Sequence, residues 1–177
     1  MNILIVYASK TGVAQTCAQM LANKLMPRYS VTLRSVQDLP LPAPDEFDVV
    51  VLGSSIRYGK VNKIFKRYIK QYAETLNSLP CAVFLCCGFP RNFEEYVDTQ
   101  IPKSLHCSLG FHSFGGELKP DKLKGFDKFL VKRIRNSIRF QDFEESDRDH
   151  HILPEIFVEN INLLEEQIRQ LNEKSTC

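Results

Sequence analysis

Apolar runs alternate with amphipathic segments along this chain of 177 residues. Short continuous apolar runs at 3–7, 47–52 and 81–87 predict strands that are buried on both faces. The segment 31–35 alternates apolar and polar residues, which is typical of a wetter edge strand. A fifth strand is expected over 110–117.

Between these strands, apolar residues recur at helical spacing. The pattern predicts helices over 14–25, 61–76, 93–107, 122–139 and 154–172. Strands and helices alternate five times, without a repeat, a low-complexity tract or a linker. The pattern therefore predicts a single α/β domain over residues 1–177, a three-layer sandwich around a five-stranded parallel sheet of order 2-1-3-4-5.

Composition and charge narrow the class of protein. The formal charge is +2, too small to indicate a nucleic-acid partner, and the apolar fraction of 44% is ordinary for a globular protein. No apolar stretch reaches the ~20 residues of a membrane span, and no basic region precedes the first apolar run. We therefore expect a cytoplasmic protein that does not bind nucleic acid.

The six cysteines form no C-x-x-C pair, which favours buried, reduced thiols. The adjacent Cys86 and Cys87 could instead form a redox or metal pair, but neighbours on a strand point to opposite faces. The adjacent His150 and His151 likewise share no face. We expect no metal site.

The first apolar run leads into a hydroxyl-rich turn with one glycine, and a helical pattern follows. The turn's N–H groups and the helix N-terminus would point at one spot and favour an anion there. Gly12 would let the backbone come close to that ligand. The candidate phosphate-binding residues are Ser9, Lys10, Thr11, Gly12, Val13 and Ala14.

Several known phosphate loops do not fit this turn. It lacks the three glycines of a dinucleotide fingerprint and the Gly-Lys-Ser/Thr of a P-loop, and Ala8-Ser9 and Gly53-Ser54 stand where a receiver domain needs acidic residues. The remaining pattern, Ser-x-Thr-Gly opening a helix, resembles the FMN-phosphate loop of flavodoxins. That family usually continues with x-Thr, whereas this chain has Val13-Ala14. The alternative is an ordinary strand–helix turn.

Two further loops follow predicted strands and would meet the first one at the same edge of the sheet. If the resemblance holds, Tyr58 can stack on the flavin ring, backbone N–H groups of 54–58 can reach its polar edge, and 87–89 would contact the opposite edge. In the alternative, Arg57 and Tyr58 are solvated turn residues. The candidate ring-binding residues are Ser54, Ser55, Ile56, Arg57, Tyr58, Gly59, Cys87, Gly88 and Phe89.

The segment Val-Leu-Gly-Ser-Ser-Ile-Arg-Tyr-Gly-Lys at 51–60 is more specific. It resembles the menaquinone-dependent protoporphyrinogen IX dehydrogenases, a flavodoxin-like family, and the likeness continues over 65–80. Weaker matches lie at 115–118 and 126–129. The resemblance implies FMN as cofactor and a step of haem biosynthesis, in which hydrogen from protoporphyrinogen IX passes through the flavin to menaquinone or another quinone.

In that family role, Arg57 is the candidate catalytic residue, pairing with the flavin edge or with a substrate propionate. Lys60 and Lys63 would add basic contacts. One alternative is a flavodoxin-type electron carrier without its own substrate, but such carriers are typically acidic around the flavin. Another is a flavin-free interaction domain, which Ala14 alone supports.

A basic stretch covers 119–139, where eight basic residues stand against Asp121 and Asp127, a balance of +6. A basic amphipathic helix can lie on an anionic membrane surface, which suits a quinone acceptor and a peripheral position on the inner face of the cell membrane. The alternative is a helix that covers the sheet and exposes its lysines to solvent.

Overall fold

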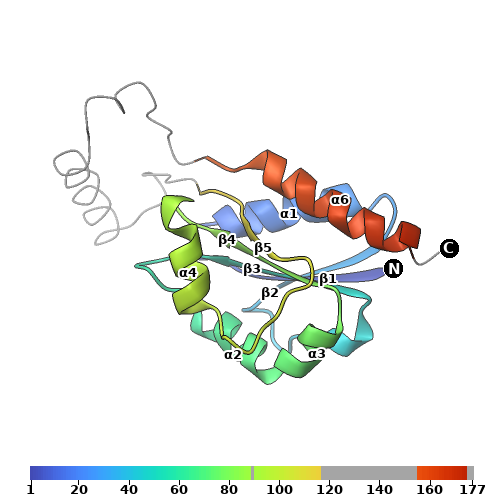
Figure 1. Cartoon of the computed structure of the whole chain (residues 1–177), viewed down its shortest axis with the longest axis horizontal. Helices are drawn as coiled ribbons and strands as arrows, with labels where there is room; N and C mark the ends of the chain where they lie inside the picture. The colour runs from blue at the N-terminus through green and yellow to red at the C-terminus, as the bar shows by residue number, and fades with distance from the viewer. Residues whose placement is uncertain (89, 117–154, 175–177) are drawn as a thin grey trace.

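The computed structural model describes residues 1–88, 90–116 and 155–174 and has a parallel five-stranded sheet at its centre (Figure 1). The strand order is β2-β1-β3-β4-β5, which confirms the predicted order and fold class. β3 and β4 are buried almost throughout, whereas the edge strand β2 is partly exposed. The strands are β1 (Asn2–Ala8), β2 (Ser30–Ser35), β3 (Val49–Ser55), β4 (Cys81–Cys86) and β5 (Phe111–Ser113).

Helices cover both faces of the sheet, so the molecule has three layers (Figure 1). α1 (Val13–Leu25) and α6 (Val158–Lys174) pack on one face. α2 (Lys63–Gln71), α3 (Ala73–Ser78) and α4 (Phe93–Gln100) lie on the other, with the short 3₁₀ helices η1 (Pro44–Glu46) and η2 (Pro90–Asn92) in the connections. Each face of the sheet therefore has its own apolar core.

Gly53 in β3 makes room for an aromatic stack in the core. The Phe84 and Phe114 rings lie 4.4 Å apart at 15°, and a Cβ on Gly53 would overlap the Phe84 ring. A glycine weakens a strand unless another group approaches closely, and here that group is a phenyl ring. Gly53 therefore serves core packing near the end of β3, two residues before the loop begins.

The predicted helix over 61–76 is in fact two helices. Asn62 caps α2, because its Oδ1 accepts hydrogen bonds from the N–H groups of Ile64 at 2.8 Å and Phe65 at 3.4 Å. The helix breaks at Tyr72, whose φ of −114° and ψ of 21° are not helical. The apolar stripe continues through the break, so its periodicity alone could not reveal it.

Three other boundaries also differ from the prediction. α4 ends at Gln100 instead of 107, because Ile101 precedes Pro102 and is extended. β5 has three residues within 110–117, and α6 begins at Val158 instead of 154. The predicted helix over 122–139 lies outside the described residues.

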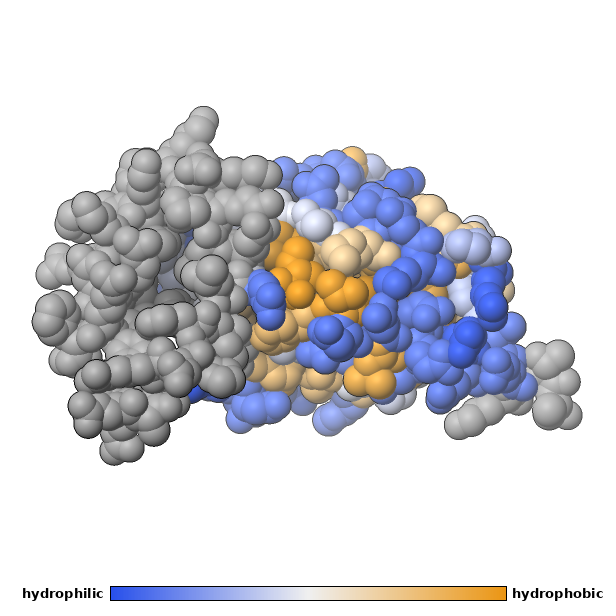
Figure 2. Space-filling view, turned by 90° about the horizontal axis from the view of Figure 1, so that it is seen from above, coloured by the Kyte–Doolittle hydropathy of each residue, from blue (hydrophilic) through white to orange (hydrophobic). Residues whose placement is uncertain are grey.

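The surface of the α1 and α6 layer is mostly polar, with one apolar patch (Figure 2). The large exposed hydrophobic residues on these helices and next to them include Met26, Val158 and Leu163. Within the described ranges, no helix combines the length and the apolar character that a membrane crossing needs.

Candidate functional site

Three loops leave neighbouring strands at the carboxyl edge of the sheet. Strand pairing sets Ala8 opposite Ser54 and Ser55 opposite Cys86. The loops after β1, β3 and β4 therefore emerge side by side, which is where parallel sheets of this order bind ligands. The structure thus brings the predicted loop regions together, with Phe89 lying outside the described residues.

The first loop folds back on itself before α1. The N–H of Gly12 donates to Ser9 Oγ at 3.1 Å, and Gly12 adopts a left-handed φ of +95°. A Cβ at this position would meet nothing within 4 Å, so the space above Gly12 is open. The backbone conformation favours glycine at this position.

The N-terminus of α1 has the features of an anion-binding site. No side chain caps it, and no acidic residue lies in its first turn. The side chains of Val13 and Ala14 are buried, so these residues offer only their N–H groups, which have no partner within a helix. Open space and free backbone donors fit a phosphate, and the missing family hydroxyl after Val13 does not close this space.

The second loop contains a tight hairpin at 57–60. Arg57 N–H donates to Lys60 O at 2.9 Å, and Lys60 N–H donates to Arg57 O at 3.0 Å. Tyr58 and Gly59 between them have φ of 51° and 70°, as in a type I′ turn. Tyr58 is the only non-glycine residue with positive φ among those described, and its side chain is 52% exposed.

Arg57 lies on the Tyr58 ring. Its guanidinium carbon is 4.9 Å from the ring centroid, and its Nη2 donates to the Tyr58 hydroxyl at 3.4 Å. The attraction between the guanidinium and the aromatic face favours this one orientation of Arg57. The side chain is therefore held beside Tyr58 in the loop after β3.

The expectation that backbone N–H groups of 54–58 face a ligand is wrong at two positions. Ile56 N–H donates to Cys86 O at 2.8 Å, and Arg57 N–H closes the hairpin. Within the described chain, the N–H groups of Tyr58 and Gly59 have no backbone partner. The donors available to a ring are therefore at the hairpin tip.

Ser54 and Ser55 anchor this loop. Ser54 is completely buried, and its hydroxyl donates to Ser55 O at 3.2 Å. The Ser55 hydroxyl donates to Ala8 O at 3.4 Å, across to the first loop. The Ser55 hydroxyl thus ties the second loop to the first.

The third loop begins at Cys87 and depends on residues far along the chain. Cys87 N–H donates to Gly115 O at 2.8 Å. A Cβ on Gly116 would lie 2.5 Å from Cys87 O and 2.9 Å from Gly88 N. Gly115 is bridged in turn to Ile156, just before α6. Gly115 and Gly116 thus position this loop, a role that the sequence indicated only as a weak family match.

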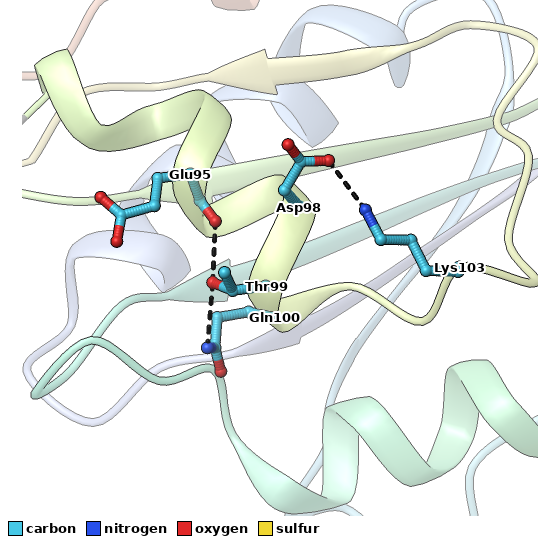
Figure 3. A network of polar contacts seen from close by, with 5 residues as sticks. All are labelled: Glu95, Asp98, Thr99, Gln100 and Lys103. Carbon is cyan, nitrogen blue, oxygen red and sulfur yellow. Dashed lines mark hydrogen bonds and ion pairs between the residues drawn. The ribbon is translucent and has the colours of Figure 1, made fainter.

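Tyr96 lies near Cys87 of the third loop, and the sequence did not single it out. It lies one turn into α4, and partial burial, followed by the nearby Cys87 and Glu95, raises the pKa of its phenol. The other face of α4 is polar: Lys103 pairs with Asp98 at 2.9 Å, and the Thr99 hydroxyl donates to Glu95 O at 2.7 Å (Figure 3). The apolar and aromatic residues Phe93, Tyr96 and Val97, spaced three and four apart, were the sequence signal for the face of α4 that packs on the core.

The cysteines beside the site act as packing groups. Cys86 Sγ lies 3.6 Å from Cys17 Sγ, and a hydrogen bond between these thiols, together with burial, raises the pKa of Cys86. A protonated, buried thiol is neither a nucleophile nor a metal ligand. In the part of the chain that the structure describes, no group of three His, Cys, Asp or Glu side chains could hold a metal ion.

Comparison with known proteins agrees with this geometry. Residues 4–144 match the model of the flavodoxin domain family. Protoporphyrinogen IX dehydrogenase [quinone] of Escherichia coli K12 is 26% identical over 146 residues, which covers 76% of this chain and 78% of that protein. The protein of the same name from Leishmania major is 31% identical over 142 residues, covering 74% of this chain and 61% of that protein.

Among solved structures, a flavodoxin of Streptococcus pneumoniae aligns over 96% of this chain and 99% of its own. The TM-score is 0.54 at 14% identity, so this likeness supports the fold alone. Flavodoxin domains bind FMN, and the FMN prediction is confirmed at the level of the family. With the strand order, the three loops and the family match in agreement, the chain belongs to the flavodoxin domain family.

Proposed function

We propose that this protein is an FMN-dependent oxidoreductase that takes hydrogen from protoporphyrinogen IX and passes it to a quinone. The relatives from Escherichia coli and Leishmania major are both named protoporphyrinogen IX dehydrogenase [quinone], which supports the reaction class. The observation that carries the proposal is the placement of Arg57, which is stacked on Tyr58 at the rim of the candidate site.

Bound FMN would supply the electron-accepting ring, and the chain's own residues would hold the reactants. The N–H groups at the start of α1 and the open space at Gly12 fit the phosphate. The exposed Tyr58 ring offers a flat face for stacking. No residue need act as acid or base catalyst, since cofactors of this kind carry the redox chemistry themselves.

Arg57 is assigned to a carboxylate of the substrate. Protoporphyrinogen carries two propionates, and a guanidinium held in place binds a carboxylate with two parallel hydrogen bonds. The exposed Lys60 and Lys63 follow within six residues and add positive charge near Arg57 in the chain. A dianionic substrate would be both attracted and oriented by this group.

The direct test is an anaerobic assay. Protein reconstituted with FMN is mixed with protoporphyrinogen IX and a menaquinone analogue, and protoporphyrin fluorescence is followed. We expect quinone-dependent product above controls that lack protein or FMN. A flavin that binds but stays oxidised with protoporphyrinogen present would reject this substrate.

The Arg57→Ala variant tests the assigned residue. We expect kcat/KM for the reduced substrate to fall about tenfold to a hundredfold, because a charge-assisted hydrogen bond contributes roughly 1.5–3 kcal/mol. FMN content should change little. Arg57→Lys should recover part of the loss, and Arg34→Ala on the edge strand β2 should behave like the wild type. Equal losses of FMN and turnover would make Arg57 a cofactor residue only.

A flavodoxin-type electron carrier is the second candidate, and membership of the flavodoxin domain family supports it. The cations Arg57, Lys60 and Lys63 argue against it, because typical carriers are acidic around the flavin. Reduction by a partner protein without turnover of protoporphyrinogen would favour the carrier.

A peripheral membrane position is also part of the proposal, because quinones such as menaquinone dissolve in lipid. The basic stretch 119–139, expected to make this contact, lies outside the described residues. Binding of the protein to vesicles can be measured independently of turnover.

A further inference from the structure

The hairpin at 57–60 and α2 together form a segment that has basic residues but no acidic ones. Between Arg57 and Gln71 there are six lysines and arginines and no aspartate or glutamate. On α2, the cations lie opposite the buried Phe65, Tyr68 and Ile69. The α2 basic face, as we call it, consists of the exposed Lys63, Arg67 and Lys70 and the half-buried Lys66.

Helix stability does not explain this arrangement. Lys63 and Arg67, and likewise Lys66 and Lys70, are like charges four residues apart, which repel each other on a helix. Lys63 also stands at the N-terminus of α2, where a cation opposes the helix dipole. None of the four is in an ion pair with any described residue. These charges therefore destabilise the isolated helix, and no ion pair with a described residue offsets that cost.

The position of the face connects it to the candidate site. α2 starts three residues after Lys60, the last residue of the hairpin that carries Tyr58. Tyr58 is 52% exposed, and tyrosine next to cations is typical of surfaces that meet the headgroup region of a bilayer. The helix lies on the sheet face away from α1 and α6, so neither of these covers it (Figure 1).

We propose that the α2 basic face docks the protein on an anionic lipid surface, with the hairpin tip next to the bilayer. The exposed positions of α2 are Lys63, Arg67, Lys70 and Gln71, so the contact is electrostatic and reversible. The choice of lipid rests on the proposed function, whose quinone acceptor dissolves in the membrane. Docking here would present the candidate site to that acceptor.

The test uses the full-length protein loaded with FMN and vesicles in a sedimentation assay. We expect binding to phosphatidylcholine vesicles that contain phosphatidylglycerol, a loss of binding at high salt, and no binding to phosphatidylcholine alone. The combined variant Lys66→Gln, Arg67→Gln and Lys70→Gln should bind anionic vesicles about a hundredfold more weakly, because each cation near such a surface contributes roughly fivefold.

A matched control removes the same charge elsewhere. Lys24→Gln, Arg28→Gln and Arg34→Gln are exposed substitutions on α1, the turn after it and β2, and this triple variant should bind nearly as well as the wild type. Both triple variants should keep their FMN and reduce a water-soluble quinone analogue equally well. Only the α2 variant should lose activity with quinone embedded in anionic vesicles.

Three results would overturn the proposal. The first is equal vesicle binding by the α2 variant and the wild type. The second is wild-type binding that does not depend on anionic lipid. The third is tighter binding to RNA than to anionic vesicles at the same salt. If vesicle binding depends on α2 but protoporphyrinogen is not oxidised, the proposed reaction fails while the docking surface stands.

Discussion

The first and third loops of the site lie at the same edge of the sheet but are built in different ways. The first loop is local: Gly12 N–H bonds to Ser9 three residues back, and α1 follows at once. The third is assembled over long range, because Cys87 is held by Gly115. Gly115 is in turn bridged to Ile156.

This difference separates two functions within one site. The proposed phosphate site needs only a short turn and a helix N-terminus, so we expect it to survive changes elsewhere in the fold. The backbone at Cys87 and Gly88 packs on residues 114–116 after β5, which are held by hydrogen bonds to the C-terminal segment at 155–157. We infer that affinity for the cofactor can be retained while the shape of the ring and substrate side changes.

The largest effect should come from disrupting the long-range contact that holds the third loop. In Gly116→Ala, the new Cβ would meet Cys87 O at 2.5 Å and Gly88 N at 2.9 Å, so the backbone must shift. We expect the free energy of unfolding in urea to fall by about 2–4 kcal/mol. Gly12→Ala is the matched control: it meets nothing within 4 Å, and its left-handed φ costs only about 1–2 kcal/mol. Equal losses in the two variants would contradict the contrast between the loops.

A negative charge at Gly12 in the first loop should instead weaken FMN binding. In Gly12→Asp, a carboxylate would stand at the proposed phosphate site, and its repulsion of the phosphate should raise the FMN dissociation constant about a hundredfold. Gly12→Asn, similar in shape but neutral, should retain more affinity, since asparagine tolerates a left-handed backbone. Binding is measured by titrating the apoprotein and following flavin fluorescence.

Riboflavin makes this test specific, because it lacks the phosphate. Its affinity should change much less than that of FMN in Gly12→Asp. Wild-type affinity for FMN in the variant would show that the phosphate does not bind at the start of α1.

The same contrast explains how much the sequence could predict. The strand order and the first loop follow from local patterns: apolar runs define the strands, and Ser-x-Thr-Gly marks the turn before α1. The predicted role of Gly12 agrees with its φ of +95°. Arg57 and Tyr58 lie in the loop after β3, as the pattern predicts, and their roles at the site stay predictions.

The missed features depend on partners that are distant along the chain. Nothing near Gly116 in the sequence reveals that Cys87 packs against it, and nothing near Tyr96 reveals its neighbour Cys87. The break at Tyr72 falls within a continuous apolar stripe. The N–H groups of Ile56 and Arg57 were assigned to the ligand, but β4 and the hairpin already use them.

The hairpin tip offers the smallest effect, and it tests whether Tyr58 serves the site at a cost to the fold. Tyr58 has a φ of 51°, where asparagine before glycine is the favoured type I′ pair. Tyr58→Asn should therefore stabilise the apoprotein by about 0.5–1 kcal/mol in urea unfolding. If its ring stacks on the flavin, the same change should weaken FMN binding about threefold to tenfold.

Tyr58→Phe separates the ring from its hydroxyl. It keeps the aromatic face and loses only the long hydrogen bond from Arg57 at 3.4 Å, so both stability and FMN affinity should stay near the wild type. A stabilised Tyr58→Asn variant with unchanged FMN affinity would remove Tyr58 from the ring site. A destabilised one would mean that the ring's packing under Arg57 outweighs the backbone strain. Opposite shifts in stability and affinity are what a residue kept in a strained conformation for binding requires.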